Sequence, residues 1–367
     1  MRAPSAFVLL GLAALAGCGG EGSGSASGSG GAGGSTSEAP PLPWAAEKVP
    51  AAREPADNPT TQPKVDLGRL LFYDPILSSD RAVACATCHS EEWGMSDGLP
   101  LSIGTLGVGP TGPGRTGPNL TRRNSLTLWN VANRSPLFWD GRAATLEDQV
   151  LAPLKEPKEL GRDPDEVAKD LGAIPGYVTL FQAAFPKDSP AVTVTNMQRA
   201  LAAFERSLIS DRAPYDHYVA GDSGALSDDA VKGMFLFAEA GCAGCHAPPL
   251  FESMRFFDRG VAPVPGVADD GRGEVTHERL DQGAFRVPTL RNVRESGPYF
   301  HTGAVASLED AVKQEAARSP KPLSDDDITA IVTFLDKGLI DPSRSPDRPA
   351  QVPSGLPVPL DGFRIPR

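Results

Sequence analysis

The chain of 367 residues lacks the features that mark several large functional classes. Its 35 lysines and arginines are outnumbered by 46 aspartates and glutamates, which argues against nucleic acid as a partner. After the N-terminal segment, no apolar run is long enough to cross a membrane. Phosphate-binding glycine loops and nucleophile triads are absent. No strand-rich alternating region stands out among the 36 prolines and 39 glycines, so we expect a mainly helical, loop-rich fold.

Cysteine and histidine are scarce, with five residues of each, yet most of them fall in two short motifs. These are Cys85-Ala86-Thr87-Cys88-His89 and Cys242-Ala243-Gly244-Cys245-His246. Two thiols at this spacing add across the vinyl groups of one haem, and the adjacent histidine becomes the proximal iron ligand. A zinc ribbon would need four closely placed ligands and has its histidine at another offset. The motifs therefore predict two covalently bound c-type haems.

The N-terminus has the pattern of an export signal. Residues 1–17 carry one early charge and then an apolar run too short to span a membrane. Leu15-Ala16-Gly17-Cys18 resembles a bacterial lipobox, although an ordinary cleaved signal with an incidental cysteine is the alternative. Residues 18–64 form a linker, first Gly/Ser-rich and then Pro-rich. We expect a lipid anchor at Cys18 on the periplasmic side of a bacterial outer membrane, and no other membrane contact.

The remaining length suits two domains, which we predict at residues 65–220 and 221–343. A tail at residues 344–367 is expected to pack back on the first domain. Residues 127–150 align without a gap on residues 289–312, and half of the aligned positions are identical. Thr145 and Ser307 occupy equivalent helix-capping positions in the two copies. The predicted fold is therefore two class I cytochrome c-like haem domains related by internal duplication.

The two copies differ at positions near the haem-binding segments. Trp139 in the first copy stands where His301 stands in the second, and Gln149 stands against Ala311. Sites that differ in this way are suited to different tasks. We expect one haem to carry out chemistry and the other to transfer electrons.

The chain resembles the bacterial di-haem cytochrome c peroxidase and MauG-type superfamily. The resemblance rests on both C-x-x-C-H motifs and on four further segments in a fixed order: Arg123-Asn124-Ser125-Leu126-Thr127, Phe138-Trp139-Asp140-Gly141-Arg142, Val287-Pro288-Thr289-Leu290-Arg291-Asn292 and Pro298-Tyr299-Phe300-His301-Thr302-Gly303. It implies that peroxide meets the N-terminal haem and that electrons pass through the C-terminal haem, with Trp139 between them.

The resemblance also assigns individual residues. Glu159 matches the acid-base carboxylate, and Gln149 matches its neighbouring amide. Asn124 matches the side-chain ligand of a calcium ion, whose other protein ligands would be backbone carbonyls near Ser296 and Pro298. His301 matches a position near the haem edge, where a propionate or structural contact is expected.

Three functions remain open. The first is a peroxidase that reduces hydrogen peroxide with electrons from a small periplasmic redox protein, a cytochrome c or a cupredoxin. The second is a MauG-type enzyme that uses peroxide to oxidise a Trp or Tyr of a partner protein. The third is an electron carrier or redox sensor without turnover, which the asymmetry of the repeats disfavours. A homodimer is compatible with each of the three.

Two departures from the family pattern concern the iron ligands. Glu315 stands where the peroxidases have a Met and the MauG-type enzymes a Tyr. As a sixth ligand of the C-terminal iron, this carboxylate would lower its potential; the alternative is that Glu315 points to solvent. No His occurs between His89 and His217, so the loop at residues 102–105 offers no histidine to the N-terminal iron. We therefore predict activity without prior reduction.

Overall fold

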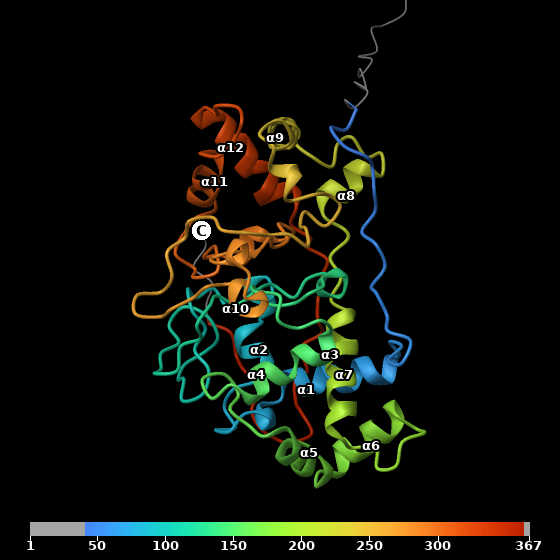
Figure 1. Ribbon diagram of the computed structural model, residues 1–367. Helices are drawn as coiled ribbons and strands as arrows, with labels where there is room; N and C mark the ends of the chain where they lie inside the picture. Colours follow the sequence, from blue (N-terminus) through green and yellow to red (C-terminus); the bar gives the residue numbers. More distant parts are fainter. Residues whose placement is uncertain (1–40, 363–367) are drawn as a thin grey trace, which may run out of the picture. The chain divides into compact units, whose positions relative to one another are not determined.

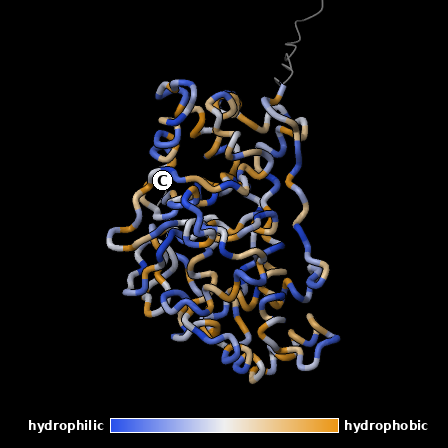
Figure 2. Tube along the Cα trace, in the orientation of Figure 1, coloured by the Kyte–Doolittle hydropathy of each residue, from blue (hydrophilic) through white to orange (hydrophobic). Residues whose placement is uncertain are grey.

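The computed structural model describes residues 41–362. The predicted export signal, Cys18 and the Gly/Ser-rich part of the linker lie outside these residues. Within the described range, no helix has both the length and the apolar character needed to cross a membrane. Figure 2 shows short apolar stretches interleaved with hydrophilic ones along the whole trace.

The fold is mainly helical with little sheet, as predicted (Figure 1). The α-helices are α1 (Gln62–Tyr73), α2 (Cys85–Cys88), α3 (Leu146–Gln149), α4 (Leu151–Lys155), α5 (Pro164–Gly172), α6 (Pro175–Ala184), α7 (Val194–Arg206), α8 (Pro214–Val219), α9 (Asp228–Glu239), α10 (Gly273–Thr276), α11 (Leu308–Ala316) and α12 (Asp325–Thr333). Two short antiparallel strands, β1 (Phe256–Phe257) and β2 (Phe285–Arg286), pair with Phe256 opposite Arg286.

The first hydrophobic core forms where α1 packs on α7. Leu67, Leu71 and Phe72 on α1 are fully buried there. The two backbones approach so closely that a Cβ at Gly68 would overlap the Ala200 carbonyl. A glycine is therefore required at this crossing.

The second core is built in the same way from α9 and α12. A Cβ at Gly233 would overlap the Ala330 carbonyl, as at the first crossing. Met234, Phe237 and Phe334 fill the interface around this contact. Each C-x-x-C-H motif thus follows the first helix of a closely crossed pair, α1 or α9.

Hydroxyl side chains cap several helices, and the caps predicted at Thr145 and Ser307 are among them. The side chains of Thr145, Ser227, Ser307 and Ser324 each accept a hydrogen bond from the backbone N–H three residues later, at the starts of α3, α9, α11 and α12. After α12 the chain continues as a π-helix, η7 (Phe334–Gly338).

Ordered structure begins before Val65, where we expected folding to start. Residues 41–61, which we call the N-terminal strap, run from the α8 region to α1 (Figure 1). The Trp44 indole N–H donates to the Tyr215 hydroxyl at 2.8 Å, and the Asn133 amide donates to the Pro50 carbonyl at 3.2 Å. The Pro-rich composition had suggested a spacer, but these long-range contacts hold the strap on the helices.

The C-terminal tail also lies along the first helical region. Arg348 pairs with Glu91, with Nε 2.6 Å from the carboxylate oxygen. The Ser354 hydroxyl donates to the Asp74 carboxylate at 2.7 Å. Beyond it, the Gly362 N–H donates to the Thr111 carbonyl at 2.7 Å. The tail therefore contacts segments near the start of the first haem motif.

The two aligned segments share local backbone structure. Leu137 forms an antiparallel bridge with Ala143, and the equivalent Tyr299 forms one with Val305. Each bridge encloses a tight turn that is followed by a capped helix, α3 or α11. Aligned residues thus adopt matching conformations in the two halves of the chain.

Candidate active site

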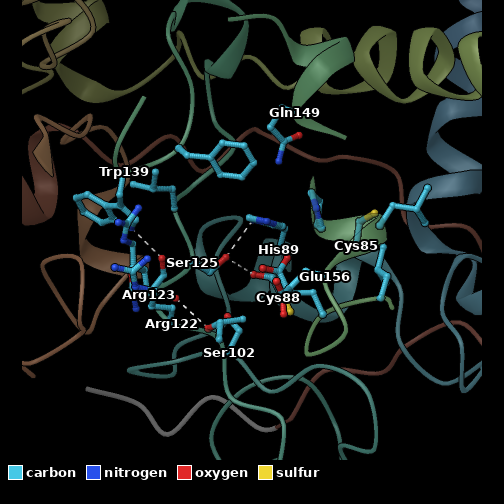
Figure 3. Close-up of a pocket in the computed structure, with 18 of the residues that line it drawn as sticks. Cys85, Cys88, His89, Ser102, Arg122, Arg123, Ser125, Trp139, Gln149 and Glu156 are labelled. Atoms are coloured by element: carbon cyan, nitrogen blue, oxygen red, sulfur yellow. Dashed lines mark hydrogen bonds between the residues drawn. The ribbon is translucent and has the colours of Figure 1, made fainter. Parts of the chain in front are cut away.

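The first haem motif opens onto a cavity of about 750 Å³. Cys85, Cys88 and His89 line it from α2, while Trp139 and Gln149 line it from other segments (Figure 3). No disulfide joins the motif cysteines of the described chain. Both thiols are therefore free, at the cavity wall, to form thioether bonds with a haem.

His89 is oriented as an iron ligand requires. Its Nδ1 lies 3.0 Å from the Met95 carbonyl oxygen, which can only accept, so Nδ1 carries the proton. This leaves the lone pair of Nε2 for a metal. Burial lowers the pKa of His89 and raises the pKa of Cys85 to about 12, so the imidazole is neutral and the thiol protonated. These donors fit a haem with a proximal histidine.

The second motif adjoins a cavity of about 350 Å³, lined by Cys242, Cys245 and His246. His246 repeats the arrangement of His89, with Nδ1 3.1 Å from the Phe251 carbonyl oxygen. Burial lowers the pKa of His246 as well. The second donor set therefore also fits a haem.

Trp139 lines both cavities and is 8% exposed. Its indole N–H donates to the Asn124 carbonyl at 2.8 Å. Its ring centroid lies 6.4 Å from that of His301, the residue at the equivalent position of the second copy. The structure thus brings together the two residues at which the repeats differ most clearly.

Glu159 follows α4 and lines the first cavity only. Its backbone carbonyl accepts a hydrogen bond from the Thr105 N–H at 3.1 Å. Burial raises the pKa of Glu159 to about 7, opposed by the nearby Arg142 and assisted by Glu156. Gln149, at the end of α3, lines the same cavity. The predicted acid-base residue and its neighbouring amide are therefore in one site with Trp139.

His301 is 4% exposed and lines the second cavity. Its ring stacks on Phe285 with the centroids 3.5 Å apart. Burial lowers the pKa of His301 to about 4, so the side chain is neutral near pH 7. A neutral, stacked imidazole is consistent with the structural contact expected for it.

Asn124 lies at the wall of the second cavity, together with Ser296 and Pro298. Its amide nitrogen donates to the Leu99 and Pro100 carbonyls, at 2.8 and 3.3 Å, which turns the amide oxygen away from them. No cluster of three or more His, Cys, Asp or Glu side chains suited to a metal occurs among residues 41–362. Calcium at this position would therefore rest on amide and carbonyl oxygens, and it stays a prediction.

Glu315, on α11, lines the second cavity but is paired with Arg259. The guanidinium Nε donates to one carboxylate oxygen at 3.1 Å, and Nη2 donates to the other. Each of these oxygens keeps a second lone pair, so the pairing with Arg259 does not exclude a bond to iron. Coordination of the C-terminal iron by Glu315 stays a prediction. No methionine lines this cavity in the described part of the chain.

Several residues at the cavities had no assigned role in the sequence analysis. Arg142 packs its guanidinium carbon 3.5 Å from the Phe138 ring centroid and pairs with Asp140. Glu205, on α7, lines the first cavity, and its burial raises its pKa to about 8. Arg142 lay within a recognised motif and could have been considered. Glu205 and Arg259 carry no local signal, because only the tertiary fold brings them to the cavities.

Comparisons with known proteins bear on this arrangement. The family described as di-haem cytochrome c peroxidase matches residues 62–224. The cytochrome c551 peroxidase of Pseudomonas aeruginosa is 36% identical over 284 residues, covering 76% of this chain and 79% of that protein. The chain belongs to the di-haem cytochrome c peroxidase and MauG superfamily. It is an oxidoreductase of the cytochrome c peroxidase type, and membership implies haem cofactors.

Both branches of the superfamily are represented among its relatives. The methylamine utilization protein MauG of Methylorubrum extorquens is 40% identical over 269 residues, covering 72% of this chain and 70% of that protein. A crystal structure of a MauG-like protein associated with microbial copper homeostasis superimposes with a TM-score of 0.71 at 28% identity. It covers 83% of this chain and 97% of that one. The superfamily resemblance is thus confirmed, and the mainly helical fold is like that of a MauG-like protein.

Proposed function

We propose that this protein reduces hydrogen peroxide to water at the first cavity, with electrons delivered through the second. The supporting observation is the asymmetry of the two cavities: Glu159 and Gln149 line the first and not the second. Burial raises the pKa of the Glu159 carboxyl to about 7 at the first site, whereas the carboxylate at the second site, Glu315, is paired with Arg259. This difference favours proton transfer, and so chemistry, at the first site.

The overall step converts one hydrogen peroxide, two electrons and two protons into two waters. Haem, when bound, supplies the iron that takes up the peroxide oxygen and exchanges the electrons. Glu159 accepts the proton from the near oxygen of peroxide and returns it to the departing one. A carboxyl whose pKa is near 7 can do both at neutral pH. Gln149 is in the same cavity and can hold the peroxide or a water by its amide.

Trp139 is the proposed route for electrons between the two sites, because its side chain lines both cavities. Its indole N–H is fixed by the Asn124 carbonyl. The repeated helix pairs and the matching turns also support two haem domains related by duplication. The donor in this proposal is a small redox protein that delivers electrons at the C-terminal haem.

The test combines composition and turnover. Purified protein should contain two haems per chain by pyridine haemochrome assay, and both should remain attached after denaturation. With a reduced cytochrome c as donor, it should consume one peroxide for every two cytochromes oxidised. One haem per chain, or peroxide loss without oxidation of any small redox protein, would refute the proposal.

A MauG-type protein oxidase is the second candidate, and the second cavity favours it. The described residues lining that cavity include no methionine, and they include Glu315, which stands in the sequence where the family has its sixth ligand. An oxygen ligand favours oxidised iron, so a site of this kind stores an oxidising equivalent better than it accepts an electron. Under this candidate, Glu315→Met should raise the potential of the C-terminal haem and speed electron uptake from cytochrome c. An unchanged potential would remove the argument for the protein oxidase.

A further inference from the structure

Arg286, on β2, is a buried cation whose hydrogen bonds are incomplete. Its side chain is 2% exposed and lines the second cavity. Its Nη2 donates to the Pro136 carbonyl. Within residues 41–362, neither Nε nor Nη1 has a hydrogen-bond partner. Two nitrogens of a charged group, which carry three N–H donors, are thus left unsatisfied at the wall of a proposed haem site.

The described residues around Arg286 supply no carboxylate that is free to pair with it. Arg134 and Arg272 lie close enough to disfavour its charge. Glu252 is the favourable carboxylate nearby, but it is already engaged by Arg134, with Nε 2.9 Å from its oxygen. Burial, followed by repulsion from Arg134, lowers the pKa of Arg286 to about 10. A guanidinium in such a place needs an anion, since an unpaired buried charge is strongly destabilising.

We propose that Arg286 binds a propionate carboxylate of the haem in the second cavity, through the guanidinium nitrogens that the protein leaves unpaired. This inference rests on the proposed two-haem function. The propionates are the anionic groups of a haem, and Arg is well suited to bind a carboxylate. Arg286 lines the second cavity and not the first, which assigns it to the C-terminal haem.

The contacts of Arg286 give this pairing a further consequence. Its backbone N–H donates to the Trp139 carbonyl at 2.8 Å, and its Nη2 bonds the Pro136 carbonyl of the same loop. The propionate edge of the C-terminal haem is therefore tied to the loop that carries Trp139. A positive charge beside a haem also stabilises its reduced form, because reduction lowers the charge on the iron.

The experiment compares Arg286→Gln and Arg286→Lys with a matched control, Arg255→Gln. Arg255 is an exposed arginine of the same region, with one bond to the Gly244 carbonyl at 3.2 Å. The readouts are the potential of the C-terminal haem by spectroelectrochemistry and its propionate-bending band by resonance Raman, both without peroxide. We expect Arg286→Gln to lower the reduction equilibrium constant about tenfold, which is 59 mV for one electron, and to shift the band.

Arg286→Lys should leave the potential of the C-terminal haem close to the wild-type value, because it keeps the charge. It should still shift the propionate band. Arg255→Gln should change the equilibrium constant less than about twofold, because solvent screens its charge. If Arg286→Gln cannot retain haem, the band of Arg286→Lys decides the question. An unchanged band in both Arg286 variants overturns the proposal. A wild-type potential that shifts on adding phosphate or chloride also overturns it, since a small anion would then occupy Arg286.

These outcomes are separable from the proposed function. A protein that binds two haems, shows the band shift and yet fails to reduce peroxide refutes the peroxidase proposal and leaves the Arg286 assignment standing. A protein that turns over peroxide normally but shows no band shift in either Arg286 variant refutes the Arg286 assignment alone.

Discussion

At the scale of single residues, the character of Glu159 is set by where its carboxyl lies rather than by its neighbours in sequence. The segment Lys155-Glu156-Pro157-Lys158-Glu159 is highly charged, and most of it is exposed. Glu156, Lys158 and Glu159 all line the first cavity, and at Glu159 burial raises the pKa to about 7. Arg142 opposes this shift, so removal of that guanidinium would raise the pKa further. The carboxyl is thus prepared to gain and lose a proton near neutrality.

The pH dependence of peroxide reduction follows from this pKa. Glu159 must be ionised to accept a proton, so kcat/KM for peroxide should rise with pH and level off above about 7. Glu159→Gln should be slower by on the order of 10²-fold or more at pH 7.5 and should lose the inflection. The measurement is a pH-rate profile from pH 5 to 9.

Glu156→Gln is the matched control, because Glu156 is a second carboxylate of the same turn that also lines the first cavity but is exposed. It should retain the rate and shift the inflection slightly to lower pH, since Glu156 raises the pKa of Glu159. A Glu159→Gln enzyme as fast as wild type, or one with an unchanged inflection, would show that another group handles the proton.

Sequence reasoning identified the residues whose chemistry is local and missed those that depend on long-range packing. The haem cysteines and histidines and Trp139 belong to motifs with fixed spacing, and Glu159 was assigned by the family resemblance. The sequence alone does not show that Arg286 is buried without an anion. Nor does it show that Arg259 pairs with Glu315 on α11. Such pairings depend on loops brought together by the fold, and no local pattern encodes them.

At the scale of structural elements, the loop at residues 102–105 holds the Glu159 turn in place. A Cβ at Gly104 would overlap the Lys158 carbonyl and lie 2.8 Å from the Glu159 Cα. Thr105 adds two hydrogen bonds, from its N–H to the Glu159 carbonyl at 3.1 Å and from its hydroxyl to the Pro157 carbonyl at 2.8 Å. The loop therefore fixes the backbone that carries the acid-base residue.

Gly104→Ala should displace the Glu159 turn, because the added methyl has no space. We expect kcat/KM for peroxide to fall at least tenfold and the pH inflection near 7 to move, since the carboxyl leaves its buried position. The control is Gly224→Ala, at an exposed glycine whose Cβ would meet nothing closer than an Asp222 oxygen at 3.5 Å. A lower rate with the inflection unchanged would indicate general destabilisation and contradict a positioning role for this loop.

A helix could be predicted from the sequence where residues next to it in the chain mark its start. Thr145 and Ser307 marked helix starts because a hydroxyl cap needs only the next turn. The N-terminal strap was not recognised, because its proline-rich sequence has the composition of a spacer. Its order comes from partners far along the chain, such as Tyr215 for Trp44.

At the scale of the whole molecule, the strap and the tail connect segments that are far apart in sequence. Trp44 joins the aromatic cluster of the second core, with its ring centroid 6.0 Å from that of Phe251. Further along the strap, the Asn58 amide donates to Glu147 at 2.6 Å, beside the first core. In the tail, Arg348 pairs with Glu91, which follows the first haem motif closely in sequence. Both segments thus hold the surroundings of the two cavities in one arrangement.

The first cavity has no second histidine with which to close the N-terminal iron. Among the described residues that line it, His89 is the only histidine, and its Nδ1 is committed to the Met95 carbonyl. The loop at residues 102–105 carries no histidine and is anchored to the Glu159 turn by Gly104 and Thr105. A loop fixed in this way cannot supply a ligand that must later be released.

We therefore expect the fully oxidised protein to react with peroxide without prior reduction. Stopped-flow mixing of the all-ferric protein with peroxide should give a rate constant within about twofold of that for protein reduced by one electron, because no ligand has to leave. The ferric spectrum at pH 7 should show a high-spin or water-bound component from the N-terminal haem. An all-low-spin ferric spectrum, with peroxide reactivity appearing only after one-electron reduction, would mean that a residue outside the described lining closes the iron.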